Sequence, residues 1–265
     1  MTNKSTSFIE NRNQLIEYFN DGIKKNTNLR IGVEHEKFLF NKTDLKRVDY
    51  DQIKKIFEIL KEKGWRPQLE KDKLVGLHRQ NQKITTEPGF QYELSGAPFK
   101  NIHSVCSENS SHFNELKEVF KSTNITTSSI AYDPFNKLID IPKSPKERYK
   151  IMTNEMPKRG KLSLDMMYKT AGIQINYDYT SEKDFEKKFK IGNYLAPLTI
   201  ALFANSPFYE NKPSGFLSYR GKVWQETNRG GIMPITFENV NFEKYVDYAI
   251  SYPILFIKKD NVSSS

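Results

Sequence analysis

The alternation of hydrophobic and polar positions between residues 30 and 40 predicts a β-strand that is covered on both faces. Because successive side chains of a strand point to opposite faces, residues of one parity share a face. One face carries Ile31, Val33 and Leu39, and the other carries Phe38 and Phe40. The strand should therefore lie inside the fold, with neighbours on each side.

Hydrophobic residues spaced three and four apart predict helices along the whole chain. The clearest one follows Asp51, with hydrophobic residues at i, i+3, i+4 and i+7 before a stop signal at Gly64. The other expected helices begin at Ser7 by a capping box, span residues 101–121, begin at Ser181, span residues 194–204 with Pro197 in the first turn, and span residues 242–250.

Short alternating segments predict further strands. Residues 74–95 contain three of them, broken at Gln80-Asn81 and Pro88-Gly89, which is typical of an antiparallel meander. Other strand-like segments lie at residues 124–131, 173–179 and 253–257. The proline-bearing residues 132–160 are interpreted either as an interdomain linker or as an ordered connecting region with a short helix. Together these elements predict an α+β fold.

The composition supports a substantial core, since the 265 residues are 37% hydrophobic and 13% aromatic. The net charge of +9 fits a polyanionic partner, a nucleoside triphosphate, or lysines on solvated helical faces. Lysines are spread along the chain among Asp and Glu, which favours the solvated faces. No basic motif with interleaved aromatic residues is present, so we expect no nucleic-acid partner.

The compartment is predicted from the cysteine content and from the lack of targeting signals. Cys106 is the single cysteine, which fits a reducing compartment and excludes an intramolecular disulfide. Neither a signal peptide nor a run of 18 hydrophobic residues is found, so we expect no membrane association and a cytoplasmic protein.

The first predicted strand carries two acidic residues, Glu34 and Glu36, on one face. Their side chains would be about 6–7 Å apart along the strand. Burying two like charges is costly unless a cation balances them, and oxygen ligands suit Mg2+ or Mn2+. A solvent-exposed sheet face would need no ion, so the spacing leaves both interpretations open.

Two further acidic residues, Glu87 and Glu93, lie on adjacent segments joined by the Pro88-Gly89 turn. With Glu34 and Glu36 they could form a cluster of four carboxylates on one sheet face, which is the kind of site that binds divalent ions. The sequence therefore predicts a candidate metal site within the sheet.

Other polar residues are candidates for substrate contacts. Gln174 and Asn176 share one face of a predicted strand, where they would supply oxygen ligands, bind a substrate, or satisfy other sheet residues. Arg220 lies in a predicted loop among glycines, where its planar fork could hold a carboxylate or phosphate. The alternative is a surface arginine. No P-loop, dinucleotide-binding glycine motif or nucleophile elbow occurs, which argues against those enzyme classes.

Several segments together resemble the plant and proteobacterial type of glutamate-cysteine ligase. In chain order they are IGVEHEKF, TEPGFQYELSGAP, LDMMYKTAGIQIN, ALFANSPF and GFLSYRGKVW. The resemblance runs from about residue 8 to 257. It implies a glutamine-synthetase-like catalytic fold, with a curved antiparallel sheet. The implied reaction is the ATP-dependent ligation of L-glutamate to L-cysteine through a γ-glutamyl phosphate, the first step of glutathione biosynthesis.

The resemblance also implies roles for individual residues. Mg2+ or Mn2+ would be held by Glu34, Glu36, Glu87 and Glu93, with ATP as co-substrate. Arg220 would be catalytic and would face the glutamate or its phosphorylated intermediate. The residues implied to bind substrates are Gln174, Asn176, Asn205, Ser206, Tyr219 and Arg220.

Members of the resembled family run well beyond 265 residues, usually with a helical C-terminal region. We therefore expect a single catalytic domain over residues 1–265 that lacks this region. Two alternatives stay open: a γ-glutamyl ligase that uses another amine, and a truncated, non-catalytic fragment that binds ATP or glutamate. The oligomeric state is open as well.

Overall fold

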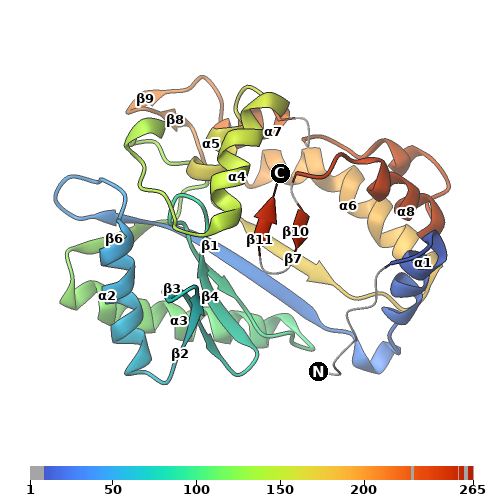
Figure 1. Ribbon diagram of the computed structural model, residues 1–265, viewed down its shortest axis with the longest axis horizontal. Coiled ribbons are helices and arrows are strands. Elements are labelled where there is room, and N and C mark those ends of the chain that lie inside the picture. The colour runs from blue at the N-terminus through green and yellow to red at the C-terminus, as the bar shows by residue number, and fades with distance from the viewer. Residues whose placement is uncertain (1–8, 228–229, 256, 260–261, 265) are drawn as a thin grey trace. The chain divides into compact units, whose positions relative to one another are not determined.

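The computed structural model describes residues 9–227, 230–255, 257–259 and 262–264 (Figure 1). Contacts within the chain group it into two compact units. The first unit comprises Met1–Arg30, Tyr177–Pro197 and Ile232–Ile254. The second comprises Ile31–Asn176, Leu198–Gly231 and Leu255–Ser265. Whether the chain acts as a single catalytic domain stays a prediction.

The second unit is built on a seven-stranded sheet. Six strands follow one another in the order β2-β3-β4-β5-β1-β6, and β7 also pairs with β1. Their bounds are β1 Ile31–Asn41, β2 Arg66–Glu70, β3 Lys73–Arg79, β4 Gln82–Thr86, β5 Tyr92–Ser95, β6 Ile125–Ser128 and β7 Ile173–Tyr177. The pairs β2-β3, β3-β4, β4-β5, β1-β5 and β1-β6 are antiparallel. The predicted α+β class and the meander are confirmed, whereas β2 was not predicted.

The two faces of β1 are both covered, as the alternation predicts. Leu39 belongs to the main hydrophobic core, to which α2 (Tyr50–Lys61) and α3 (Ile102–Ser122) contribute buried residues. Phe38 and Phe40 point to the other face, where they form a smaller buried cluster with Ala171. The sheet therefore separates a core under two helices from the face that carries the acidic residues.

Local signals explain the two helices under the sheet. α2 begins with a capping box between Asp49 and Gln52, and Gly64 adopts a φ of +87° just after the helix. In α3 the N-cap Asn101 accepts a hydrogen bond from the backbone N–H of Ser104. Both predicted helices are thus confirmed within a few residues.

The second unit also contains the elements that follow β6. These are η2 Leu138–Asp140, α4 Glu147–Glu155, η3 Met156–Arg159, α5 Ser163–Lys169, β8 Phe208–Tyr209, β9 Lys212–Pro213, α7 Tyr219–Gln225, β10 Ile257–Lys259 and β11 Val262–Ser264. Residues 132–160 form an ordered connecting region, so the linker interpretation is wrong. The strand expected over residues 253–257 is also wrong for residues 253–255, which lie outside any strand.

The first unit is helical and is held together by aromatic side chains. It contains α1 Arg12–Asp21, η1 Asn26–Asn28, η4 Pro234–Phe237, α8 Phe242–Ser251 and the beginning of α6 Glu182–Leu202. Phe19 of α1 packs against Phe242 of α8 with ring centroids 5.7 Å apart, and Phe185 of α6 lies 5.2 Å from Phe242. The aromatic cluster explains why these three segments come together in one unit.

Two helix boundaries differ from the prediction. α1 begins at Arg12, because Asn11 supplies the N-cap by accepting a hydrogen bond from the backbone N–H of Gln14. Ser7 lies outside the described residues. The two helices expected after Ser181 are one continuous helix, α6, and Pro197 lies inside it. The sequence predicted a helix start near Pro197 because a proline is tolerated in a first turn and disfavoured in a helix interior.

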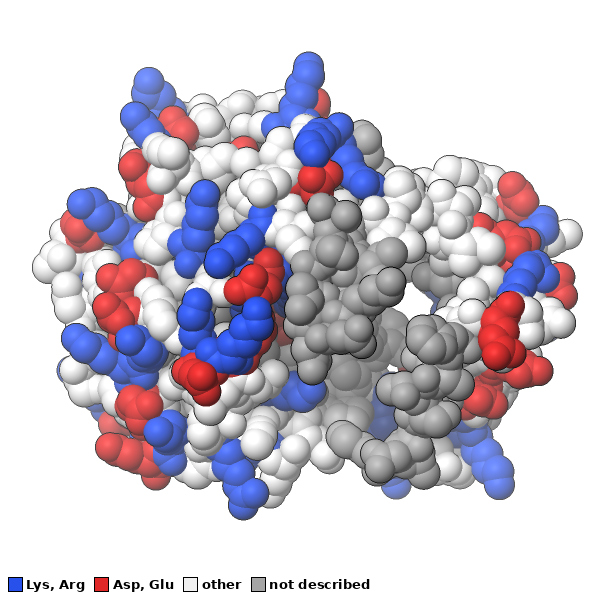
Figure 2. All heavy atoms as spheres, in the orientation of Figure 1, with Lys and Arg blue, Asp and Glu red and all other residues white. Residues whose placement is uncertain are grey.

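The surface charge agrees with lysines on solvated faces. On the face of the molecule drawn in Figure 2, Lys and Arg side chains alternate with Asp and Glu over the described part of the surface. Many of them form ion pairs three or four residues apart along helices, such as Lys121 with Glu118 and Lys188 with Asp184. Within the described ranges, none of the helices has the length and hydropathy that crossing a membrane requires.

Candidate active site

A pocket of about 270 Å3 opens on the second unit. Its lining combines acidic and polar residues with a hydrophobic wall. The lining residues are Glu34, Glu36, Glu87, Pro88, Gln91, Tyr149, Met152, Met166, Met167, Thr170, Gly172, Ile173, Gln174, Arg220 and Trp224. Three of the four predicted metal ligands therefore line one pocket, together with Arg220.

The acidic wall is built by the pairing of β1 with β5. Glu36 lies directly opposite Glu93, and Glu34 lies opposite Ser95, whose hydroxyl donates to the carboxylate of Glu93 at 2.6 Å. Directly opposed residues of two antiparallel strands share a face, so Glu93 belongs beside Glu36 although it is not among the lining residues. The backbone N–H of Gly172 donates to Glu36 at 2.7 Å.

The environment of these carboxylates disfavours their charged form. Burial, reinforced by the charges of Glu87 and Glu93, raises the pKa of Glu36 to about 7. The Gly172 N–H and the Arg220 guanidinium oppose the shift without cancelling it. Burial likewise raises the pKa of Glu87, with Glu93 adding to the effect. The pocket thus holds acidic groups whose charge the protein only partly compensates.

Glu87 is held from the side of α4. The hydroxyl of Tyr149 donates to Glu87 at 3.2 Å and accepts a hydrogen bond from Arg148 at 2.8 Å. Burial raises the pKa of Tyr149, so its hydroxyl keeps the proton that it donates. Lys146 is buried nearby, donates to the carbonyl of Thr86 at 2.8 Å, and opposes the pKa shift of Glu87. Sequence analysis missed these residues, although the aromatic and basic content of residues 132–160 was the available signal.

Arg220 lies in the first turn of α7, so its expected position in a loop is wrong. Ser218 caps this helix by accepting from the backbone N–H of Gly221 at 3.1 Å. The Arg220 guanidinium lies over Trp224, with Cζ 5.7 Å from the ring centroid. Among the described residues its Nε has no hydrogen-bond partner. Burial lowers the pKa of Arg220, and Glu36 opposes this effect.

Three of the predicted substrate-binding residues lie outside the pocket lining. The buried hydroxyl of Ser206 accepts from the backbone N–H of Arg220 at 3.1 Å. Asn205 donates through its side chain to the carbonyl of Ser129. Tyr219 packs edge-on against Tyr132, with centroids 4.9 Å apart. In this structure Ser206 and Tyr219 hold the start of α7 in place, and Asn205 ties its loop to Ser129. Direct substrate contact by any of the three stays a prediction.

The polar pair on β7 meets the acidic wall. Asn176 donates to Glu34 at 3.3 Å and accepts from Gln174 at 3.2 Å. Gln174 lines the pocket, and both side chains are exposed. The structure therefore brings Gln174 and Asn176 to the site, as the shared face of their strand predicts.

The sequence of the chain matches a known protein family. A family model described as Glutamate-cysteine ligase family 2 matches residues 30–263. This chain belongs to Glutamate-cysteine ligase family 2.

Curated relatives of the family agree with this match. Glutamate–cysteine ligase A, chloroplastic, from Oryza sativa subsp. japonica is 44% identical over 253 residues, which cover 94% of this chain and 51% of the relative. The chloroplastic glutamate–cysteine ligase of Arabidopsis thaliana is 44% identical over 254 residues, covering 94% and 49%. That of Nicotiana tabacum is 43% identical over 250 residues, covering 93% and 48%. The chain spans about half the length of these relatives.

The names of these relatives contradict the predicted compartment. All three are chloroplastic ligases, so the prediction of a cytoplasmic protein is wrong. The prediction was based on the single cysteine and on the lack of a long hydrophobic run. A single cysteine indicates a reducing environment, and the lack of a long hydrophobic run bears only on membrane spans. Neither property distinguishes the cytosol from the interior of a plastid.

The residues of this family member fit a hard divalent cation in their chemistry. Burial and the repulsion between neighbouring acids raise the pKa of Glu36 and Glu87. A cation would relieve that repulsion, and the carboxylates offer it oxygen ligands. In the described ranges, no three His, Cys, Asp or Glu side chains gather closely enough to hold one ion. In this conformation an ion would therefore meet at most two carboxylates. That is a common arrangement for Mg2+, which completes its coordination with water and substrate phosphates.

Proposed function

We propose that this chain carries the catalytic site of an ATP-dependent glutamate–cysteine ligase. The observation that carries the proposal is the pocket in which Glu34, Glu36 and Glu87 lie together with Arg220. The 42–44% identity to plant ligases of this name supports the same reaction. The antiparallel sheet with its acidic face is consistent with a glutamine-synthetase-like fold, which we include in the proposal.

The proposed reaction has two steps. An oxygen of the γ-carboxylate of glutamate attacks the γ-phosphorus of ATP, and the bond to ADP breaks. The amine nitrogen of cysteine then attacks the acyl carbon of the γ-glutamyl phosphate, phosphate leaves, and the nitrogen loses a proton. No protein nucleophile is needed, because positioning and charge neutralisation carry such phosphoryl transfers.

The residues of the chain supply the positioning. Pairs of carboxylates among Glu34, Glu36, Glu87 and Glu93 would hold Mg2+ or Mn2+, each ion meeting at most two of them. A bound ion would offset the negative charge of the phosphates. Arg220 binds a substrate carboxylate or the transferring phosphoryl group through its planar fork. The hydrophobic wall formed by the three methionines and Trp224 excludes water from the acyl phosphate, which would otherwise hydrolyse.

An ATP-hydrolysis assay with three substrate conditions tests the proposal. ATP is supplied with glutamate alone, with glutamate plus cysteine, and with glutamate plus other amines, and the peptide product is quantified. We expect γ-glutamylcysteine to form only when cysteine is present. A product with another amine in place of cysteine would identify a different γ-glutamyl ligase. Binding of ATP without any product would indicate a non-catalytic fragment.

A further inference from the structure

A buried arginine lies beside the pocket without being part of its lining. Arg47 follows β1 and turns back along it, forming an isolated bridge with Phe40. Its side chain is 0% exposed, and its Cζ lies 4.5 Å from the centroid of Phe38. Phe38 occupies the same face of β1 as Glu36, two residues further along. Arg47 is therefore close to the acidic wall in the sheet but directed away from solvent.

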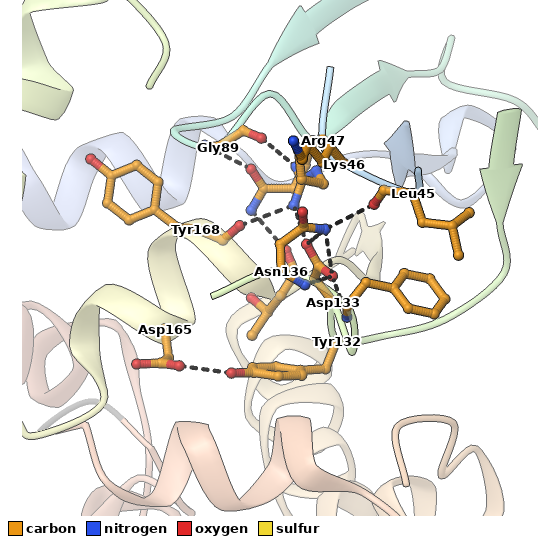
Figure 3. A network of polar contacts seen from close by, with 12 residues as sticks. Leu45, Lys46, Arg47, Gly89, Tyr132, Asp133, Asn136, Asp165 and Tyr168 are labelled. Carbon is orange, nitrogen blue, oxygen red and sulfur yellow. Dashed lines mark hydrogen bonds and ion pairs between the residues drawn. The ribbon is translucent and has the colours of Figure 1, made fainter. Parts of the chain in front are cut away.

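The guanidinium of Arg47 joins two segments that carry pocket residues (Figure 3). Its Nη2 donates to the carbonyl of Gly89, in the turn between Glu87 and Gln91. Its Nη1 donates at 3.3 Å to the carbonyl of Tyr168, next to Met167 at the end of α5. Arg47 thus ties the Glu87 turn to the hydrophobic wall, alongside Gln91, whose side-chain amide donates to the carbonyls of Met167 and Thr170.

Asp133 balances this buried charge. Its carboxylate lies 3.4 Å from Nη1 of Arg47 and is 0% exposed. It is held in turn by the backbone N–H groups of Phe135 and Asn136, at 2.9 and 3.2 Å. The side-chain amide of Asn136 donates to Asp133 and also, at 3.1 Å, to the carbonyl of Leu45 (Figure 3). The loop that carries Asp133 and the segment that carries Arg47 therefore hold each other.

We propose that Arg47, Asp133 and Asn136 form a positioning clamp, here named the Arg47 clamp, that sets Glu87 against the end of α5. The proposal rests on the proposed function, since it assigns a purpose to the geometry of that same pocket. Stability alone is a poor reason for such a group, because a buried ion pair is often replaceable by hydrophobic residues. A planar fork that reaches two backbone carbonyls from one point gives a fixed distance between them, which a hydrophobic side chain does not.

The test exchanges Arg47 for lysine, which keeps the charge beside Asp133 but cannot reproduce the fork. The matched control is Arg12→Lys, because Arg12 also pairs with an aspartate, Asp247, but is exposed and belongs to the first unit. Both variants are first checked for cooperative thermal unfolding. Mn2+ binding to the 265-residue chain is then measured by electron paramagnetic resonance, and hydrogen exchange is measured for residues 86–92.

For Arg47→Lys we expect about threefold to tenfold weaker Mn2+ binding and faster exchange in residues 86–92, because outer partners of metal ligands tune metal affinity. Arg12→Lys should change neither quantity. A folded Arg47→Lys with the parent's Mn2+ affinity and exchange would overturn the clamp. A parent chain that binds no Mn2+ would instead count against the proposed function, and exchange alone would then decide the clamp.

A second variant covers the case in which Arg47→Lys does not fold. Asn136→Ser removes the donor to the Leu45 carbonyl without changing a charge, and it should loosen the clamp in the same direction. Faster exchange in residues 86–92 with a smaller loss of Mn2+ affinity is the expected result. Unchanged exchange in this folded variant would contradict the proposal.

Discussion

Two glutamates on opposite sides of the sheet meet opposite electrostatic environments. Burial alone would raise the pKa of Glu115 on α3, but the nearby His112 ring and hydrogen bonds from Arg79 and Trp65 outweigh it and lower the pKa to about 2. For Glu36 on β1, burial and neighbouring acids dominate and raise the pKa to about 7. The fold therefore balances the negative charge of Glu115, the carboxylate that it uses for packing. It leaves the pocket carboxylates short of positive charge, which indicates a site for an external cation or ligand.

The largest effect is expected from a substitution of Glu36, the pocket carboxylate whose pKa is raised. Glu36→Gln removes one negative charge and almost no volume, so glutamate-dependent ligation should fall by about a thousandfold or more. The melting temperature should stay equal or rise, because the cost of burying the charged form disappears. A loss of ligation is also expected for Glu34→Gln. Steady-state kinetics at ordinary Mg2+ concentrations, with calorimetry for stability, measure both quantities.

The control for this prediction is Glu118→Gln. Glu118 is exposed on α3, and its side chain forms an exposed ion pair with Lys121, so its loss should be silent in both assays. Turnover of Glu36→Gln close to that of the parent would remove Glu36 from the reaction. The high pKa of Glu36 would then reflect packing alone.

A smaller loss is expected for Arg220→Lys. If the planar fork of Arg220 binds a carboxylate or phosphoryl group in two places, lysine should lose about tenfold to a hundredfold in kcat/KM while the fold is retained. The Ser206 and Ser218 hydrogen bonds use the backbone of α7 and are unaffected by the exchange. Parallel kinetics of Arg12→Lys provide the control. Parent-like kinetics of Arg220→Lys would mean that the site needs only a positive charge at this position.

The contribution of Glu115 on α3 to stability is tested by its dependence on pH. Arg79 donates to Glu115 at 2.6 Å and Trp65 does so at 3.2 Å, so Glu115→Gln should cost about 1–3 kcal/mol at pH 7. Because the folded pKa is lowered, the stabilisation is complete above about pH 4.5 and is lost as the pH falls toward 2. The variant should therefore lose less stability than the parent over that range. Urea denaturation at several pH values would show parallel curves if the ion pair contributed nothing.

The sequence predicted the elements of this fold better than their contacts. The alternation along β1, the meander and the helices α2 and α3 follow from local periodicity, which survives in the folded state. The Pro88-Gly89 turn suggested that Glu87 and Glu93 lie close together, whereas the register that sets Glu93 opposite Glu36 comes from the structure. β2 was missed because four of its five residues are exposed and it shows no alternation of hydrophobic and polar positions. α6 was divided because a proline is expected near the start of a helix, whereas Pro197 lies inside this one.

The site residues, like the elements, were predicted where local periodicity reveals them and missed elsewhere. Acidic residues at a spacing of two in a strand can be recognised as unusual, but Tyr149 and Arg47 reach the site only through tertiary packing. Cys106 falls on a helical stripe that periodicity interprets as packed, yet it is exposed. Conversely, periodicity places Glu108 on the polar side of its helix, where substitution should be silent. In the folded chain that side meets the end of β5.

The smallest expected effect concerns Glu108. One of its oxygens, Oε1, accepts from the side chain of Gln82 at 2.6 Å and from the backbone N–H of Ala97 at 2.9 Å. Glu108→Gln keeps an acceptor at that position and should cost less than about 1 kcal/mol. Glu108→Ala leaves the Ala97 N–H without its partner and should cost about 1–2 kcal/mol by urea denaturation. Two equal, negligible values would mean that water replaces the carboxylate fully. A clear difference would show that α3 fixes the strand carrying Glu93 from behind.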